Sequence, residues 1–413
     1  MKLFWVAALT AGGLCAAPKQ MANAQETNVN TRYAVESIEV LADQDVRLSR
    51  GLQDEIRRLT GARLDVLALE ELAKRIRVEL NVSNVDQRLV RGRQRDSVRV
   101  VYEITPERTE IDASVPRLLY HSRQGWTGEA EVSARYGPQR LSLGIVSDAD
   151  ELPERNSGMR LRYDNTRLGT RRLRAVFVFE SFRQQWDPAI EAAADGVAPL
   201  YRTRHMIEPS LTVVLAGPLT WTSGVSFAAI ENQFPAARTS SAHAVVNTLR
   251  YHRQWEGLGA TTHLLDAGYS LRAATSTLGS DFSFTRHHWH AAYSATRGRH
   301  TVLMNLAAGR LTGAAPIYER FVAGNSSTLR GWNKLDLVPF GGARIVHQTV
   351  EYRYRLLQAF YDTGCVWALE SPEGCRVRHS VGVGMRKDRL MLAVAFPVRS
   401  GRIEPMLMTG LTF

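Results

Sequence analysis

The chain of 413 residues lacks the features that mark most enzymes and helical membrane proteins. After residue 25 no run of about 18 consecutive apolar residues occurs, so the sequence predicts no transmembrane helix. It contains no G-x-x-x-x-G-K-[S/T] loop, so the sequence does not predict an activity driven by nucleotide hydrolysis. A hydrolase needs an ordered Ser/His/acid set, and no nucleophile motif is present. We therefore expect neither a cofactor nor a catalytic residue.

Cysteine is also scarce, with three residues in the whole chain. Cys15 lies in the N-terminal apolar segment, whereas Cys365 and Cys375 each follow a glycine and flank a turn-like Glu-Ser-Pro-Glu insert. In an oxidising compartment such a pair predicts a hairpin disulfide, with two free thiols as the alternative. A metal site needs more ligands than cluster here, and we interpret the His-x-His pair at 288–290 as polar strand residues.

The first 24 residues have the pattern of a secretory signal peptide. Met1-Lys2 is followed by a mainly apolar run over 3–17, and Ala22-Asn23-Ala24 is an A-x-A cleavage signature. Because the run is too short to span a membrane, we expect it to be cleaved after Ala24. Leu14-Cys15 has no convincing lipobox, which disfavours a lipoprotein.

The formal charge of +11 and the pI of about 9.8 come from arginines spread through the chain singly and in pairs. No aromatic-basic motif accompanies them, so together with export they predict no nucleic-acid partner. Arginines facing a polar interior or anionic lipid headgroups account better for this bias.

Residues 33–107 have the pattern of a small α+β unit. Leu48, Leu52, Ile56 and Leu59 fall on one helical face, and a second stripe runs from Leu69 to Leu80. Gly61 ends the first helix and Asp65 caps the second. The expected order is a strand at about 34–40, helices over 48–59 and 65–80, and strands over 84–92 and 97–105.

From about 110 to 413 the pattern has a period of two, which predicts antiparallel strands. Val346, Val350 and Tyr352 alternate with His347, Thr349 and Glu351, for example. A soluble sandwich also alternates, but charges on one face of so many strands require a polar interior. We predict an all-β transmembrane barrel of about sixteen strands, with fourteen as the alternative, starting at 115–123 and ending at 404–413.

A barrel of this size has a wide lumen, and the segment 312–342 is long enough to fold back into it. Gly324, Asn325, Ser326 and Ser327 allow a sharp tip. Arg330 then provides a permanent charge whose planar fork suits a carboxylate. An external loop whose arginine faces solvent is the alternative.

The best partner for Arg330 is Asp362, an isolated acid in an apolar-aromatic strand, with Glu351 as second choice. We expect Gly331 to leave room for the guanidinium to reach the wall and Gly364 to open space opposite the loop. Trp332 or Phe321 would pack beside the charge.

Five motifs occur in a fixed order and carry a family resemblance. They are Arg-Phe-x-x-Gly-x-x-Ser-x-Leu-Arg-Gly-Trp over 320–332, beginning with Arg320, then Gly341-Gly342, Glu351-Tyr-Arg353, Phe360-x-Asp362-x-Gly364, and Gly382-Val-Gly384-Met-Arg386 before a terminal Leu-Thr-Phe413. The set resembles the outer-membrane protein-assembly and two-partner-secretion transporter superfamily, the bacterial surface antigen barrels. The unit at 33–107 resembles one polypeptide-transport-associated (POTRA) domain.

The resemblance implies a sixteen-stranded outer-membrane barrel at 110–413 with a periplasmic domain at 33–107. It also implies that loop 312–342 lies in the lumen with Arg330 against Asp362, and that the protein inserts or translocates unfolded polypeptides. Outer-membrane lipid, an unfolded or partly folded client, and a periplasmic chaperone or accessory protein are the implied partners. A passive pore or structural surface antigen remains the alternative.

Overall fold

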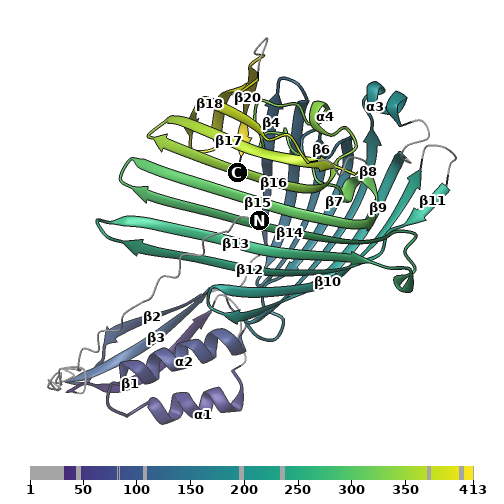
Figure 1. Ribbon diagram of the computed structural model, residues 1–413. Helices are drawn as coiled ribbons and strands as arrows, with labels where there is room; N and C mark the ends of the chain where they lie inside the picture. Colours follow the sequence, from purple (N-terminus) through teal and green to yellow (C-terminus); the bar gives the residue numbers. More distant parts are fainter. Residues whose placement is uncertain are drawn as a thin grey trace, which may run out of the picture. The chain divides into compact units, whose positions relative to one another are not determined.

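The computed structural model divides the chain into two compact units, Met1–Glu107 and Arg108–Phe413 (Figure 1). The structure describes residues 32–42, 48–80, 82, 84–105, 109–194, 200–232, 238–369, 374–399 and 404–412. The expected signal peptide, 1–24, and the terminal Phe413 lie outside these residues. Among the described residues, no helix has the length and apolar character needed to cross a membrane.

The N-terminal unit is a three-stranded sheet with two helices. Its elements are β1 (Ala34–Ala42), α1 (Arg50–Leu59), α2 (Val66–Glu79), β2 (Asn84–Arg91) and β3 (Ser97–Thr105). β3 lies in the middle, parallel to β1 and antiparallel to β2. α1 begins at Arg50 rather than at Leu48, because the Ser49 hydroxyl caps the helix by accepting from the Leu52 amide. The stripe of Leu69, Leu72 and Ile76 packs into the core of this unit.

The Glu36 carboxylate in β1 accepts three hydrogen bonds. It accepts from the Ser97 hydroxyl at 2.6 Å and from the Arg93 and Gln94 amides at 2.7 and 3.3 Å. These bonds, the Ser97 hydroxyl first, lower the pKa of Glu36 below its ordinary 4.5. A lowered folded-state pKa gives stability that is present above the unfolded pKa and lost as pH falls through the folded one.

We therefore expect Glu36→Gln to be less stable than wild type at neutral pH and to lose less stability on acidification below about pH 4.5. Hydrogen exchange of the β1 amides across the pH range measures this. Glu70→Gln, a change at an exposed position of α2, is the control. Parallel acid profiles for wild type and Glu36→Gln would rule the effect out.

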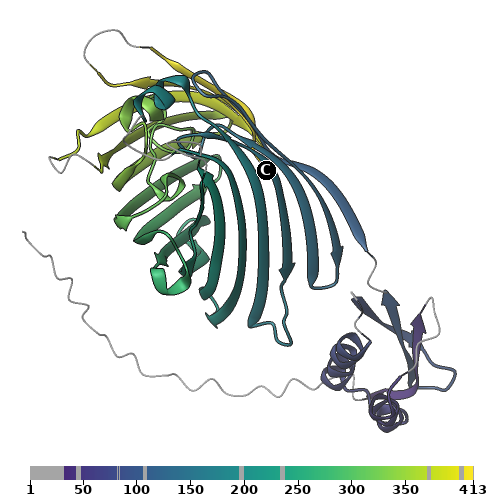
Figure 2. The same cartoon turned by 90° about the vertical axis from the view of Figure 1, so that its right-hand side faces the viewer.

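The C-terminal unit is a closed antiparallel barrel (Figures 1 and 2). Its strands are β4 (Glu110–His121), β5 (Gly125–Tyr136), β6 (Gln139–Asp148), β7 (Arg155–Asn165), β8 (Leu173–Gln185), β9 (Tyr201–Ala216), β10 (Leu219–Asn232), β11 (Arg238–Ser241), β12 (Ala244–Gly257), β13 (Thr261–Ala274), β14 (Ser283–Arg297), β15 (His300–Ala314), β16 (Gly342–Tyr354), β17 (Leu357–Ala368), β18 (Arg378–Lys387), β19 (Leu390–Pro397) and β20 (Met406–Thr412). β11 and β12 both pair with β10 and share one place in the wall, so the described strands fill sixteen positions. The prediction of sixteen strands is confirmed.

Side chains alternate across the wall as the period of two predicts. In β16 the side chains of His347, Thr349 and Glu351 are buried, whereas Val346 and Tyr352 are exposed on the opposite face. The polar set therefore faces the interior and the apolar set faces outward. Two short helices lie between strands, α3 (Pro188–Ala193) and α4 (Lys334–Leu337).

The first and last strands meet in a short seam. β20 pairs with β4 from Met408 opposite His121 to Thr412 opposite Arg117. The expected start of the first strand at 115 was wrong, because β4 begins at Glu110 and passes through an irregularity between Ser114 and Arg117. That irregularity contains Pro116, which cannot donate to a strand ladder and is tolerated at such a bulge.

Candidate functional site

A loop of residues 315–341, hereafter the lumen loop, leaves β15 and packs against inward-facing side chains before it enters β16. Several of its apolar residues are buried, among them Leu329 at 0% exposure. At the tip the Asn325 side chain accepts from the amides of Ser327 and Thr328 at 3.0 and 2.8 Å. Gly324 has φ of +90°, a conformation that favours glycine. These local contacts hold the tip in one conformation.

Arg330 lies against two acids of the barrel wall. Its Nε donates to Asp362 Oδ2 at 2.9 Å and its Nη2 to Asp362 Oδ1 at 2.9 Å, which is a bidentate pair. The Arg330 amide also donates to Asp362 Oδ2, at 3.0 Å. Nη1 donates to Glu351 Oε2 at 3.1 Å. The structure thus brings together the arginine and both acids that the sequence singled out.

Arg330 and its two acidic partners are buried. Asp362 is 0% exposed and Arg330 is 7% exposed. Burial disfavours the charge on Arg330, but the hydrogen bonds and charges of Asp362 and Glu351 outweigh it and hold the pKa above its ordinary value. The guanidinium carbon also lies 3.5 Å from the centre of the Phe360 ring, a cation–π contact. Removing any one partner would leave the others poorly matched.

Strand register explains why these wall groups meet. Thr349 lies opposite Asp362, and Glu351 lies opposite Phe360, in the β16–β17 pair. The Thr349 hydroxyl donates to Asp362 Oδ1 at 2.9 Å, and the Arg353 Nε donates to Glu351 Oε1 at 2.6 Å. Thr349 was not among the residues predicted to form the site. The period-two pattern did place it on the face of Glu351, which was the available signal.

The glycines of the motif have structural roles that differ from those predicted. Gly331 has φ of +98°, and a Cβ there would meet Pro397 N at 3.2 Å rather than the guanidinium. Gly364 opens no space opposite the loop, because a Cβ there would meet the backbone of β16, with Val346 O at 2.6 Å. The ring beneath the Arg330 guanidinium is Phe360, whereas the Trp332 and Phe321 rings lie against Arg378 and Arg286.

The two loop aromatics anchor separate stretches of the loop. Trp332 Nε1 donates to the His379 carbonyl at 2.9 Å. The Phe321 ring lies over Gly309, where a Cβ would be only 2.3 Å from it. Arg320 Nη1 donates to the Phe340 carbonyl at 3.3 Å, so it joins the two ends of the loop.

Gly382 supports the site from the next strand. A Cβ there would lie 2.0 Å from Phe360 Cζ, and the Arg330 guanidinium packs against the same ring, which limits its freedom to move. We expect Gly382→Ala to displace the ring and lower stability by about 1–3 kcal/mol through overpacking. Denaturant midpoints measure this. Gly217→Ala, where a Cβ meets nothing within 4 Å, should be neutral, and equal losses in both variants would contradict the explanation.

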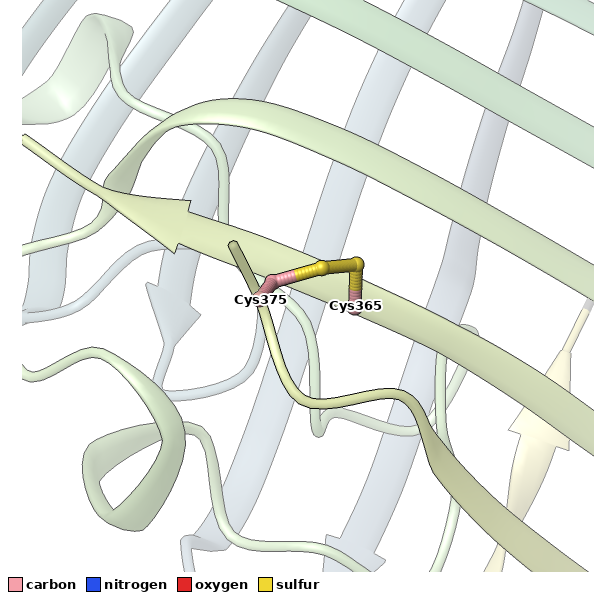
Figure 3. Close-up of a disulfide and its surroundings, with 2 residues drawn as sticks. All are labelled: Cys365 and Cys375. Atoms are coloured by element: carbon pink, nitrogen blue, oxygen red, sulfur yellow. A yellow bond between two sulfur atoms is a disulfide. The ribbon is translucent and has the colours of Figure 1, made fainter. Parts of the chain in front are cut away.

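Cys365 and Cys375 form a disulfide that links β17 to the segment before β18 (Figure 3). Their Cα atoms are 5.9 Å apart. Cys365 directly follows Gly364 and is 6% exposed, so the crosslink begins three residues beyond Asp362. Such a crosslink limits the freedom of the chain next to the strand that carries the acid.

Comparison with known proteins adds a family to this geometry. Residues 266–398 match the Omp85 superfamily domain, a range that contains the lumen loop, Arg330 and both acids. This part of the barrel therefore carries an Omp85 superfamily domain. The five ordered motifs had pointed to this superfamily, and that prediction is confirmed. No curated protein sequence matches the chain.

Solved structures share the fold of this chain at low sequence identity. BamA from Haemophilus ducreyi lacking POTRA domains 1–3 is 16% identical with a TM-score of 0.63, covering 92% of this chain and 85% of that one. CdiB from Escherichia coli is 14% identical with a TM-score of 0.52, covering 93% and 77%. CdiB from Acinetobacter baumannii is 12% identical with a TM-score of 0.53, covering 93% and 74%. At these identities the likeness concerns the fold.

Proposed function

We propose that this protein inserts or translocates polypeptides at the bacterial outer membrane, with its N-terminal unit in the periplasm. The observation that carries the proposal is the seam. In the described residues β20 covers only residues 117–121 of β4, so the stretch from Glu110 to Ser114 pairs with β5 alone. An open strand edge binds an extended segment through main-chain hydrogen bonds and tolerates many sequences.

The N-terminal unit offers a second edge of the same kind. β2 pairs with β3 on one side only, among the described residues. A client strand could add there before it reaches the barrel seam. The unit corresponds to the single POTRA-like domain of the sequence analysis, and a periplasmic chaperone or accessory protein could deliver clients to it.

The buried Arg330 pair gives the lumen loop a defined position but performs no chemistry on a client. Energy for the work would come from client folding and membrane partitioning, and no catalytic role is assigned to any residue. Outer-membrane lipid contacts the outward apolar face, to which Val346 and Tyr352 belong.

Site-specific photo-crosslinking tests the seam. A crosslinker at Ile111 of β4, which is 75% exposed, should capture an unfolded outer-membrane barrel precursor. Val132 on the adjacent β5 is 53% exposed but pairs with a strand on each side, and a crosslinker there should capture little. Equal capture at both positions, or none at Ile111 with any precursor, would favour the passive pore or structural antigen instead.

A further inference from the structure

The far limb of the lumen loop carries a buried lysine that the Arg330 site does not use. Lys334, the first residue of α4, is 4% exposed. Its Nζ donates to the carbonyls of Ala149 at 2.5 Å and Asp150 at 3.4 Å, and also to that of Leu152. An ammonium has three donors, and the turn between β6 and β7 supplies three acceptors. The segment 149–152 thus encloses the ammonium.

The same turn binds the tip of the loop. Asp150 is 1% exposed, and its Oδ1 accepts from the Ser326 amide at 2.9 Å. Its Oδ2 accepts from the Ser326 hydroxyl. One residue of the turn therefore holds the loop on both sides of Arg330, through its side chain at Ser326 and through its carbonyl at Lys334.

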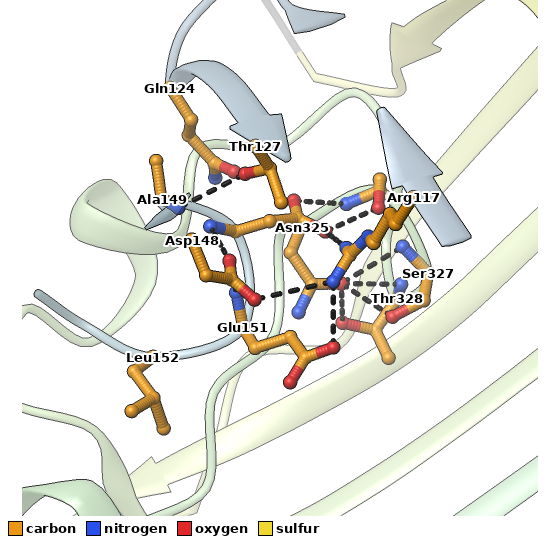
Figure 4. A network of polar contacts seen from close by, with 12 residues as sticks. Arg117, Gln124, Thr127, Asp148, Ala149, Glu151, Leu152, Asn325, Ser327 and Thr328 are labelled. Atoms are coloured by element: carbon orange, nitrogen blue, oxygen red, sulfur yellow. Dashed lines mark hydrogen bonds and ion pairs between the residues drawn. The ribbon is translucent and has the colours of Figure 1, made fainter. Parts of the chain in front are cut away.

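Asp150 also binds the seam strand. Arg117 of β4 donates from Nη2 to Asp150 Oδ2 at 2.6 Å, and from Nη1 to Glu151 at 2.8 Å and Asp148 at 3.2 Å. Figure 4 shows the Arg117 guanidinium between the acids of the turn and the loop tip with Asn325, Ser327 and Thr328. Arg117 is also the residue of β4 that lies opposite Thr412 of β20.

We infer that Lys334 and Asp150 form a second anchor for the lumen loop, and that Arg117 couples this anchor to the seam. The first anchor grips the loop from β16 and β17. The second grips it from the β6–β7 turn and, through one shared carboxylate, from β4. The Asp150 carboxylate binds both Ser326 of the loop tip and Arg117 of β4. If β4 moves away from the seam and these bonds stay intact, the loop tip must therefore move with it.

The charges at the second anchor favour this arrangement. Burial lowers the pKa of Lys334 to about 8, while Asp150 and Glu154 oppose that shift. The amine therefore still carries its proton at neutral pH. Burying these charged side chains costs solvation free energy that apolar side chains in the same place would not cost. A contribution to stability alone therefore does not explain why charged residues are found here. The set joins a specific loop position to a specific strand position.

The inference deepens the proposed function, because it links the lumen loop to the strand edge that a client would use. Its test needs no client, so failure of the coupling and failure of the transport proposal are distinguishable. The full chain is refolded in lipid nanodiscs, and backbone hydrogen exchange is followed in the loop tip, 324–330, and at the seam, 117–121 and 406–412. Lys334→Met and Asp150→Asn are compared with wild type.

We expect exchange to rise about tenfold or more in the loop tip for both variants, since each leaves buried polar groups unsatisfied. The seam amides should also exchange severalfold faster, and those of β12 and β13 should not change. Lys387→Met, which removes an exposed lysine at the end of β18, is the matched control.

Unchanged loop exchange in Lys334→Met would overturn the second anchor. Faster exchange in the loop tip with unchanged exchange at the seam would overturn the coupling. In that case the variants would have loosened the packing of the loop without any effect on β4. If either variant fails to form the barrel, the same exchange measurement is made on Ser326→Ala, and the same outcomes overturn the inference. This variant removes one hydroxyl bond to Asp150 and leaves the lysine and both wall acids in place.

Discussion

Arg330→Ala is expected to raise the single-channel conductance of the protein in planar bilayers by about threefold or more, since a barrel of this size encloses an aqueous lumen once its loop is free. Wild type should show a low or flickering current. The physical reason is that the guanidinium supplies the three side-chain bonds that tie the loop to Asp362 and Glu351. Without them the loop keeps only its other contacts and vacates the lumen part of the time.

Arg174→Ala is the control for the loss of a lumen charge. Arg174 lines a pocket of about 690 Å³ together with Arg162 and Arg250, and no residue of the lumen loop borders that pocket. The substitution should alter ion selectivity more than total current. A large steady wild-type current that is the same in Arg330→Ala would favour an open pore and would remove the loop as a plug.

Asp362→Leu should be among the most destabilising single changes in the barrel. It leaves the buried Arg330 without its bidentate partner and the Thr349 hydroxyl without its acceptor. Removing one member of a buried pair costs about 3–5 kcal/mol. The double variant Arg330→Met with Asp362→Leu should recover most of that loss, because Glu351 keeps Arg353 as a partner. Denaturant unfolding gives both values.

An exposed pair in the same barrel provides the comparison. Asp164→Leu removes the partner of Arg162, and their side chains are 22% and 45% exposed. Pairs of this kind contribute about 0–1 kcal/mol, so the change should be small. Our view of the Arg330 site is wrong if Asp362→Leu costs no more than Asp164→Leu, or if the double variant is as unstable as the single one.

Local patterns were sufficient for much of this protein. Alternation places His347, Thr349 and Glu351 on one face without any knowledge of neighbouring strands, because successive side chains of a strand point to opposite faces. The same reasoning placed Asp362 on the interior of its strand. Few acids in the neighbouring strands were then available as partners for the single arginine of the glycine-rich loop. For this reason Asp362 and Glu351 could be predicted as partners of Arg330 from the sequence.

Errors arose where a role depended on what lies across the barrel. Gly331 was expected to make room for the guanidinium and Gly364 to open space opposite the loop, yet their missing side chains allow approach to Pro397 and to β16. Phe360 was recognised as part of a motif, but its contact with Arg330 depends on the path of the folded loop. The start of β4 was placed too late, since pairing with β5 continues on both sides of the irregularity between Ser114 and Arg117.

The sequence by itself predicted a barrel, favoured sixteen strands over fourteen, and named Asp362 and Glu351 as the best partners for Arg330, because a period of two and a charge that burial must neutralise are local features. Only the tertiary structure decided that Lys334 and Ser326 meet Asp150, and that Arg117 joins them to the seam. These residues are more than 170 positions apart for the loop contacts. Barrel closure brings them together, and no local pattern specifies which turn a lumen loop will touch.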